Sequence, residues 1–237
     1  MYRGGDMIPY IIINGVNSKN ITGLLIQSLP PITKPKIRTS IEEIDGRDGD
    51  TVTELGYSAY DKTFSVGLRG DYNVDDVINY FATSGKITFS NEPDKYYNFA
   101  VYNQIDFNKL LRFKTANVTL HVQPFKYSAE ETKKEYTDAV NIQITNAGNV
   151  KSRPIMEITG DGIITVDLNY KHILTLELNN ETIKIDSEEM NAYINGAYAN
   201  RQVTGNYDEL ALNAGANTLL ISGDVSKVTF DKYSRWI

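Results

Sequence analysis

The sequence contains no cysteine, and among its 237 residues there are only two histidines and one tryptophan. The absence of cysteine excludes a disulfide framework, a zinc site built on thiolates and a thiol nucleophile. The two histidines, His121 and His172, lie in separate alternating segments with no nucleophile or acid beside them, so we expect both to be structural. These shortages predict a protein without catalytic residues, metal site or cofactor.

Long hydrophobic runs are also missing. Near the start, three isoleucines at 11–13 stand between Pro9 and Asn14, and Asp6 precedes them. This stretch is far shorter than the roughly 20 apolar residues of a transmembrane helix, and it lacks the features of a signal peptide. We therefore expect no membrane insertion and a product that is made in the cytoplasm.

Positive charge is in short supply as well. The 24 lysines and arginines are outnumbered by 30 aspartates and glutamates, which leaves a net charge of −6 at pH 7. Residues 1–128 contain equal numbers of both signs, so the whole acidic excess lies in residues 129–237. Proteins that bind nucleic acid need a basic surface to neutralise phosphates. The charge balance therefore predicts no sequence-specific nucleic acid binding.

The residues that are abundant favour β-structure. Hydrophobic residues make up 41% of the chain and charged residues 23%, which is enough apolar material for a folded core. There are 16 tyrosines and 8 phenylalanines, and Thr, Val and Ile recur throughout, as they do in pleated, half-buried sheets. We predict a mainly β fold with two domains.

The first domain is predicted to be a β-sandwich with one α-helix. Its clearest strand is Tyr60–Leu68, in which apolar and polar residues alternate. The helix is expected to begin after Asn73, whose side chain suits an N-cap, and to end before Gly85. Further strands are predicted at Ile8–Val16, at Ile21–Leu29, which would pair back on it, and at Lys86–Phe89, Tyr96–Phe107 and Leu110–Phe125.

A long hairpin interrupts this domain. Its arms, Lys36–Ile44 and Thr51–Leu55, flank Asp45–Asp50, a tip rich in residues that tolerate a left-handed backbone. The arms mix charged residues with isolated apolar ones, so the hairpin has too little apolar surface to bury on its own. We predict that it projects from the domain toward a partner.

A charged segment, Ser128–Glu135, separates this domain from a second one, and we predict domains of residues 1–128 and 129–237. Gly160–Gly162 is interpreted as a turn between two strands of the second domain. Seven short strands are predicted there: Val140–Ile144, Ile155–Ile158, Ile163–Leu168, Ile173–Leu178, Thr182–Ile185, Thr218–Ile221 and Val225–Phe230. Their spacing is typical of an antiparallel sandwich or jelly roll.

Two clusters of carboxylates suggest chemistry, but the sequence favours a solvated surface for both. Asp45, Asp48 and Asp50 lack the spacing of a calcium loop, and Arg47 lies among them. In the second cluster, Glu188 and Glu189 together with Glu177 or Glu181 are candidates for the two carboxylates of a glycosidase. Adjacent residues point apart in most conformations, and nothing else in the sequence marks a cleft.

Two sets of aromatic residues suit stacking on sugar rings, because a flat aromatic face binds the apolar side of a carbohydrate. They are Tyr96, Tyr97, Phe99 and Tyr102 in the first domain, and Tyr193, Tyr198 and Tyr207 in the second. In a β-sandwich such aromatics more often fill the core or form cross-strand pairs, and the sequence leaves both interpretations open.

The order of several short motifs resembles the distal tail (Dit) proteins of siphophages. In the first half the motifs are Ile13–Val16, Ile44–Gly49, Ile87–Pro93 with the following Tyr96-Tyr97, and Val118–Phe125. In the second half they are Asn149–Ile155, the glycine turn after it, Ile185–Ser187, Gly215–Val228 and Ser234–Trp236. The resemblance covers nearly the whole chain, although residues 2–6 depart from the family's start, which fits better at Met7.

This resemblance implies a structural protein of the virion, located at the distal end of the phage tail after synthesis in the bacterial host cytoplasm. It implies a homo-hexameric ring, or hub, that joins the tail tube protein to the tail-associated fibre protein and, in many phages, to receptor-binding proteins. Such a hub serves host attachment and DNA passage. The resemblance also implies a galectin-like sandwich for the second domain.

A closed ring is built from heterologous interfaces, so the hairpin of one subunit should rest on a different surface of its neighbour. We expect that contact to be made by Ile41, Glu42, Ile44, Asp45, Arg47 and Asp48. Two other functions remain open. One is a carbohydrate-binding module that contacts the host envelope through Tyr193 and Tyr198, and the other is a hydrolase that depends on Glu188.

Overall fold

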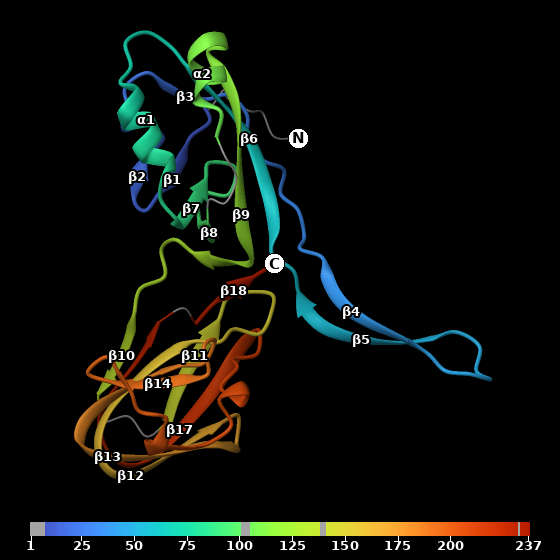
Figure 1. Ribbon diagram of the computed structural model, residues 1–237. Helices are drawn as coiled ribbons and strands as arrows, with labels where there is room; N and C mark the ends of the chain where they lie inside the picture. Colours follow the sequence, from blue (N-terminus) through green and yellow to red (C-terminus); the bar gives the residue numbers. More distant parts are fainter. Residues whose placement is uncertain (1–7, 101–104, 138–140, 232) are drawn as a thin grey trace. The chain divides into compact units, whose positions relative to one another are not determined.

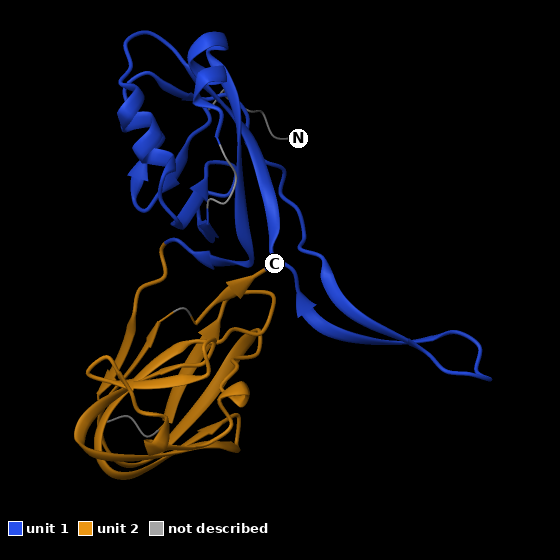
Figure 2. Ribbon diagram, in the orientation of Figure 1, with its two compact units in different colours: residues 1–129, 237 blue, residues 130–236 orange. Residues whose placement is uncertain are grey.

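A computed structural model describes residues 8–100, 105–137, 141–231 and 233–237 (Figure 1). The chain forms two compact units, residues 1–129 with 237 and residues 130–236 (Figure 2). Along the sequence this division falls one residue after the predicted boundary. Strands dominate both units, and the prediction of a mainly β fold is confirmed.

The first unit is built on one antiparallel sheet. Its strands follow the order β2-β1-β7-β8-β9-β6-β3. Their bounds are β1 Ile11–Ile13, β2 Val16–Asn17, β3 Leu24–Ile26, β6 Tyr60–Leu68, β7 Gly85–Phe89, β8 Lys95–Ala100 and β9 Thr115–Ser128, with a 3-10 turn at Ser18–Asn20. The predicted pairing of Ile21–Leu29 with the first strand is wrong, because β3 pairs with β6 and the partners of β1 are β2 and β7.

The core of the first unit lies on the face of the sheet that strand alternation selects. Phe64, Val66 and Leu68 of β6 are buried, as predicted, and Val118 pairs directly with Phe64 from the neighbouring β9. Phe64 and Phe89 meet edge to face with their ring centroids 5.9 Å apart. Burial of these large side chains is the main stabilising contribution to the unit.

Helix α1, Val74–Phe81, covers this core, and its prediction is confirmed. The Asn73 side chain accepts a hydrogen bond of 3.0 Å from the amide of Asp75 and caps the helix. Val77 and Phe81 are buried on the core side. The hydroxyl of Tyr80 donates to the carbonyl oxygen of Val16 at 3.1 Å, which ties the helix to the first strands.

A second helix, α2 at Phe107–Phe113, was not predicted, and the strand expected at residues 110–113 is wrong. Asp106 accepts a hydrogen bond of 2.9 Å from the amide of Lys109 and starts the helix. Lys114, with φ of +57°, ends it, and Leu110 is buried. The strand predicted over residues 96–107 ends at residue 100 in β8, and residues 101–104 lie outside the described residues.

The predicted hairpin is confirmed as a structure. Strands β4 (Ile37–Glu43) and β5 (Asp50–Tyr57) pair with each other as a separate two-stranded sheet. Figure 1 shows this ribbon projecting from the first unit. Its amide and carbonyl groups are therefore paired only between the two arms, and both of its faces meet solvent in the single chain.

The second unit also follows an antiparallel plan. Its strands have the order β10-β17-β12-β13-β14-β15, with β11 also on β17 and β16 also on β13. Their bounds are β10 Lys134–Thr137, β11 Asn141–Asn146, β12 Ile155–Leu168, β13 Lys171–Asp186, β14 Asn191–Ile194, β15 Ala197–Tyr198, β16 Val203–Gly205 and β17 Gly215–Asp231. The short strand β18, Arg235–Trp236, is not part of this sheet. Short 3-10 turns lie at Asn200–Gln202 and Tyr207–Glu209. Residue 140, the first of a predicted strand, lies outside the described residues.

Three strands of the second unit are longer than predicted. Six of the seven predicted segments join in pairs to form β12, β13 and β17. The pairing of β12 with β13 and with β17 shifts in register near the middle of the strands, where such bulges bend a sheet. The first half of β12 pairs with the second half of β13, and the second half of β12 with the first half of β13. Each long strand therefore contributes to both layers of a sandwich, whose shared core includes Met156, Ile158, Ile164 and Val166.

The bend in β12 replaces the turn that was predicted at residues 160–162. The register shifts between Gly160 and Gly162, so the segment is a bulge within one strand. A Cβ atom on Gly160 would lie 2.3 Å from the carbonyl oxygen of Asp224, so only glycine permits this approach of β12 and β17. In the part of the chain that the structure describes, no helix is long and apolar enough to cross a membrane.

Candidate interaction surfaces

The hairpin carries exposed apolar side chains on both arms. Ile41 of β4 lies directly opposite Val52 of β5, and the two side chains are 60% and 58% exposed. Ile44 and Leu55 are also about half exposed, at 50% and 54%. An isolated two-stranded ribbon is at best marginally stable in water, and exposed apolar clusters mark contact surfaces. These four side chains make the hairpin a candidate interface.

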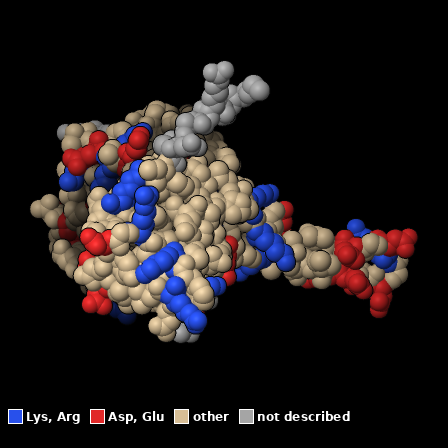
Figure 3. Space-filling view, turned by 90° about the horizontal axis from the view of Figure 1, so that it is seen from above, with Lys and Arg blue, Asp and Glu red and all other residues tan. Residues whose placement is uncertain are grey.

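The tip of the hairpin is acidic. Between residues 42 and 50 there are five carboxylates and one arginine, Arg47. Figure 3 shows acidic side chains gathered at the far end of the projecting ribbon. Glu43 and Asp50 lie directly opposite one another, a repulsive pairing that a cationic neighbour would relieve. Within the described ranges, none of the charged side chains at residues 42–50 forms a salt bridge.

The six residues predicted for a subunit contact are brought together on this ribbon. Ile41 and Glu42 end the first arm, and Ile44, Asp45, Arg47 and Asp48 form the turn or border it. Gly46 and Gly49 adopt φ values of +81° and +80°, which reverse the chain. Across the described residues, no group of three or more His, Asp or Glu side chains is arranged to hold a metal ion.

The connector that leads into the hairpin is anchored by a buried lysine, which sequence reasoning missed. Pro30 and Pro31 have no amide hydrogen, so this segment is held through its carbonyl oxygens instead. Lys62 is only 3% exposed and donates to the carbonyl oxygen of Pro31 at 2.9 Å. The side-chain amide of Asn91 donates to the carbonyl oxygen of Pro30 at 3.0 Å. The two bonds fix the point from which the hairpin departs.

Aromatic rings surround the same lysine. Its Nζ lies 4.9 Å from the ring centroid of Tyr97 and 5.5 Å from that of Tyr60, both within the range of cation–π attraction. Burial lowers the pKa of Lys62 below its ordinary value of 10.5, while the carboxylate of Glu92 opposes that shift. Glu92 itself pairs with Lys126 at 2.7 Å. Lys62, Lys126 and Glu92 therefore all have partners within the fold, so these groups support the structure.

The first aromatic set is structural. Tyr97 is fully buried, and its hydroxyl donates to Glu92 Oε2 at 2.8 Å. Tyr96 stacks on Tyr127 with ring centroids 5.5 Å apart. Phe99 is also buried, and residue 102, the fourth member of the set, lies outside the described residues. Buried rings cannot stack on a sugar, so Tyr96, Tyr97 and Phe99 form no binding surface.

Each histidine pairs with an aspartate from an adjoining strand position. His121 Nδ1 lies 2.8 Å from Asp61 Oδ1 across β6 and β9. His172 Nδ1 lies 2.8 Å from Asp167 Oδ1, and its Nε2 lies 3.1 Å from the hydroxyl of Thr175. Thr175, His172 and Asp167 are thus linked like the nucleophile, base and acid of a catalytic triad, but the His172 side chain is 53% exposed on a strand face. The imidazole is therefore open to solvent and not shielded as a catalytic base in an enclosed site would be.

The glutamates of the candidate glycosidase pair point to different partners. Glu188 Oε2 accepts a hydrogen bond of 2.8 Å from Arg235, and Glu189 Oε2 accepts one of 2.8 Å from the hydroxyl of Tyr193. Glu181 accepts from the side chain of Gln202 at 3.2 Å. The carboxylates therefore do not converge on one point, as acid–base cleavage of a glycosidic bond requires.

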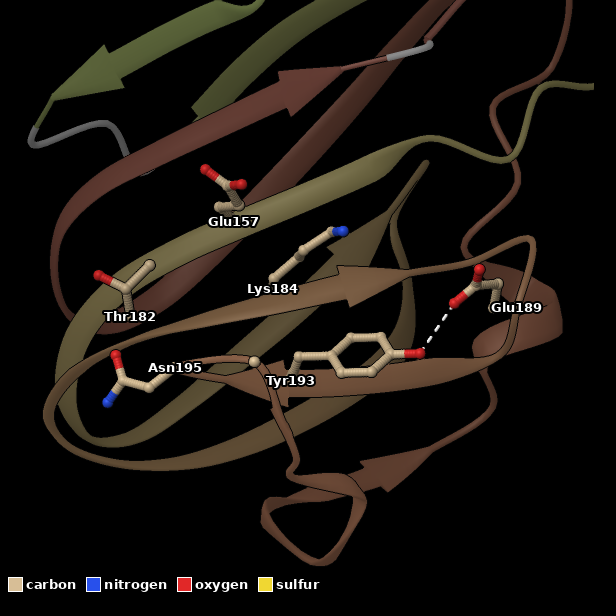
Figure 4. A pocket seen from close by; sticks show the side chains of 7 residues that line it. Glu157, Thr182, Lys184, Glu189, Tyr193 and Asn195 are labelled. Carbon is tan, nitrogen blue, oxygen red and sulfur yellow. Dashed lines mark hydrogen bonds between the residues drawn. The ribbon is translucent and has the colours of Figure 1, made fainter. Parts of the chain in front are cut away.

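The second aromatic set is partly assembled. Tyr193 of β14 and Tyr198 of β15 are direct cross-strand partners, and their rings lie 5.2 Å apart at an interplanar angle of 34°. Tyr198 is 74% exposed. Tyr207 does not join them, because it packs against the core of the unit and donates to Asn200. Tyr193 also lines a hollow of about 510 Å³ (Figure 4).

Comparison with known proteins finds similarity in structure and not in sequence. No protein-family model matches the chain, and no curated protein does. The crystal structure of the Dit protein of phage SPP1 is similar, with a TM-score of 0.65 and 16% identity, over 98% of this chain and 100% of that one. It is described as a paradigm of the hub of the adsorption apparatus in phages that infect Gram-positive bacteria.

Two structures of the phage P2 baseplate in its activated conformation are similar over 94% of this chain and 97% of theirs. The structure with calcium has a TM-score of 0.44 and 10% identity, and the structure with strontium 0.47 and 11%. At such low identities the likeness concerns the fold. The chain has the fold of the SPP1 hub protein, from its first unit to its second.

Proposed function

We propose that this chain is a structural hub protein at the distal tip of a phage tail. The observation that carries the proposal is the likeness to the SPP1 hub protein, which extends over 98% of this chain and all of that one. A match over both units, with no part of the other chain left over, supports a shared role more strongly than a match of one sandwich would. The motifs that resemble siphophage distal tail proteins support it independently.

In this proposal six copies form a closed ring, and the hairpin is the arm by which each subunit reaches the next. The exposed Ile41 and Val52 and the acidic tip supply an apolar strip and a charged end. Heterologous contacts of this kind close into a ring when the rotation between subunits permits. The contact residues are Ile41, Glu42, Ile44, Asp45, Arg47 and Asp48.

The ring would join the tail tube protein on one side to the tail-associated fibre protein and receptor-binding proteins on the other, and DNA would pass through it. Residues 1–128 carry no net charge, so copies of the first unit can pack around a channel without strong mutual repulsion. The acidic second unit would face outward and carry adhesion components. The protein would be assembled in the host cytoplasm and act in the virion.

The chemistry of the described residues supports a structural role over an enzymatic one. The histidines pair with aspartates on exposed strands, and the glutamates bind separate partners. A hydrolase would instead need two carboxylates or a nucleophile and a base at one enclosed point.

The test is the mass of the purified chain by light scattering coupled to size exclusion, followed by negative-stain imaging. We expect a particle of six times the 26.6 kDa chain mass, with a six-fold ring in the images. If the chain is monomeric alone, the tail tube protein is added and the measurement repeated. A monomer under every concentration and salt condition, with or without the tube protein, together with virions that lack the ring, would overturn the proposal.

A further inference from the structure

Four side chains form a continuous row across the second unit. Glu157 of β12 lies opposite Lys184 of β13, Lys184 opposite Tyr193 of β14, and Tyr193 opposite Tyr198 of β15. Direct cross-strand partners share one face of a sheet, so all four point to the same side. The row ends at Tyr198, since β15 is the last strand in the order of this sheet.

The row faces solvent and not the core. On β12, Glu157 lies between the buried Met156 and Ile158. On β13, Lys184 lies between the buried Ile183 and Ile185. Because side chains of a strand alternate between its two faces, the row must lie on the outer face of the sandwich. None of these four residues belongs to the hydrophobic core, so core packing does not account for their presence.

The same face is hollowed. A depression of about 510 Å³ is lined by Glu157, Lys184 and Tyr193 of the row. Thr182, Glu189 and Asn195 line it as well. In Figure 4 the Tyr193 ring lies between Glu189 at one end of the depression and Thr182 with Asn195 at the other. The hollow is large enough for a small ligand and offers polar groups around an aromatic centre.

The tyrosines are held in place before any ligand arrives. The Tyr193 hydroxyl donates to Glu189 Oε2 at 2.8 Å, and this bond raises the pKa of Tyr193 to about 12. Lys184 Nζ lies 5.7 Å from the Tyr193 ring centroid, and Tyr198 lies on the strand at its other side. Tyr193 thus stands between two neighbours, and Tyr198 presents its largely exposed ring at the sheet edge.

The polar groups of the hollow suit a ligand that carries many hydroxyls. The carboxylate of Glu157 already accepts hydrogen bonds from Lys133 and Thr229, and each of its oxygens can accept one more. The ammonium of Lys184 donates hydrogen bonds, and the side-chain amide of Asn195 both donates and accepts them. Thr182 is fixed by a hydrogen bond of 2.8 Å between its hydroxyl and that of Thr159. Aromatic rings bind the apolar face of a pyranose while such groups bind its edge.

The charge of the hollow indicates that the ligand is uncharged. The two carboxylates, Glu157 and Glu189, are balanced by the ammonium of Lys184 and by that of Lys133, which pairs with Glu157 at 3.3 Å, so the hollow has no excess of positive charge. The second half of the chain carries the whole acidic excess as well. A polyanion such as a phosphate-linked cell-wall polymer finds no excess of positive charge here and an acidic domain around it, whereas a neutral sugar needs no counter-charge.

We propose that the outer face of β12–β15 binds a neutral saccharide, with Tyr198 as the stacking platform and Glu157, Lys184 and Asn195 as hydrogen-bonding groups. This function adds to a hub role and does not depend on it, because the row uses no residue of the hairpin. A hub with such a face would contact glycan on the host envelope as well as its protein partners.

The test is saturation-transfer NMR of the whole chain with a panel of neutral oligosaccharides of glucose, galactose and N-acetylglucosamine, and with poly(glycerol phosphate) as the anionic comparison. We expect at least one neutral oligosaccharide to bind, and Tyr198→Ala to weaken its binding roughly tenfold. Lys184→Met is expected to weaken it as well. The matched control is Tyr170→Ala, which removes an 82% exposed tyrosine at the β12–β13 turn and should leave affinity unchanged.

Three outcomes would overturn the proposal: no neutral oligosaccharide binds, Tyr198→Ala and Tyr170→Ala bind alike, or only the anionic polymer binds. The oligomer mass of Tyr198→Ala should equal that of the unmodified chain. The oligomer mass therefore tests the hub role, and sugar binding tests the saccharide site. Either proposal can fail while the other holds.

Discussion

Ile41 and Val52 lie directly opposite one another on the hairpin, and each keeps more than half of its side chain exposed. Cross-strand apolar pairs usually stabilise a sheet because a further layer covers them. Here the two arms form a separate two-stranded sheet, and in the single chain no second layer buries the pair. The exposed pair supports the proposal that a neighbouring molecule covers the hairpin, and it leads to the first prediction.

Ile41→Asp is expected to break the proposed ring without unfolding the chain. The substitution places a charge in an apolar contact, which disfavours association, whereas in the single chain the position is exposed and the change in stability should stay within about 1 kcal/mol. Light scattering should show the mass fall toward that of the monomer. Ile163→Asp is the control, because Ile163 is 69% exposed in the second unit. Equal masses for the two variants would contradict the role of the hairpin.

Charge at the hairpin tip should strengthen assembly. Asp45→Asn combined with Asp48→Asn removes two of the five carboxylates between residues 42 and 50. If the tip rests on a basic surface, the concentration at which rings form should rise about tenfold at low salt, and the difference should shrink as salt screens the charges. Glu177→Gln, on an exposed strand position of the second unit, is the control. A difference independent of salt would exclude an electrostatic contact.

Lys62 should give the chain a recognisable pH dependence. Its pKa is lower in the folded protein than its ordinary value of 10.5, so the unfolded chain binds that proton more tightly. The stability contributed by this group must therefore rise as pH increases toward 10.5. The free energy of unfolding, measured in urea between pH 7 and 10, should rise more steeply for the unmodified chain than for Lys62→Met. Parallel curves would show that burial does not control this lysine.

The bend in β12 should be intolerant of a side chain at one glycine and tolerant at the next. Gly160→Ala would place Cβ 2.3 Å from the Asp224 carbonyl oxygen, and we expect a loss of about 2 kcal/mol from the resulting strain. At Gly162, with φ of +72° and no atom within 4 Å of a Cβ, asparagine tolerates the backbone and should cost less. The free energy of unfolding of each variant, measured in urea, gives the two losses. Similar losses for both variants would argue against the close approach.

Local pattern predicted much of the fold because the relevant signals act over a few residues. The alternation of Phe64, Val66 and Leu68 selected the buried face of β6, and the Asn73 cap located α1. The hairpin was visible in its glycines and in its shortage of apolar residues. Helix α2 was missed because its start depends on one hydrogen bond, which the Asp106 side chain accepts from the backbone amide of Lys109, in a segment whose apolar residues also suit a strand.

The candidate sites were harder to predict from the sequence than the fold. Tyr193 and Tyr198 were named from the sequence as candidates, but only strand pairing makes them partners and adds Glu157 and Lys184 to the same row. These residues come from strands whose register cannot be read from composition. The aspartate partners of His121 and His172 were overlooked because they pair through strand register.

The sequence by itself therefore determined the β-rich class, the absence of thiol chemistry, the acidic second half and the hairpin, because each follows from composition or from neighbours along the chain. The tertiary structure alone decided which strands run on through a bend and which side chains meet across them. Gly160 allows β12 to pass from one layer of the sandwich to the other by approaching Asp224, a residue far away in sequence. Contacts of that kind depend on packing of the whole chain, and no local pattern encodes them.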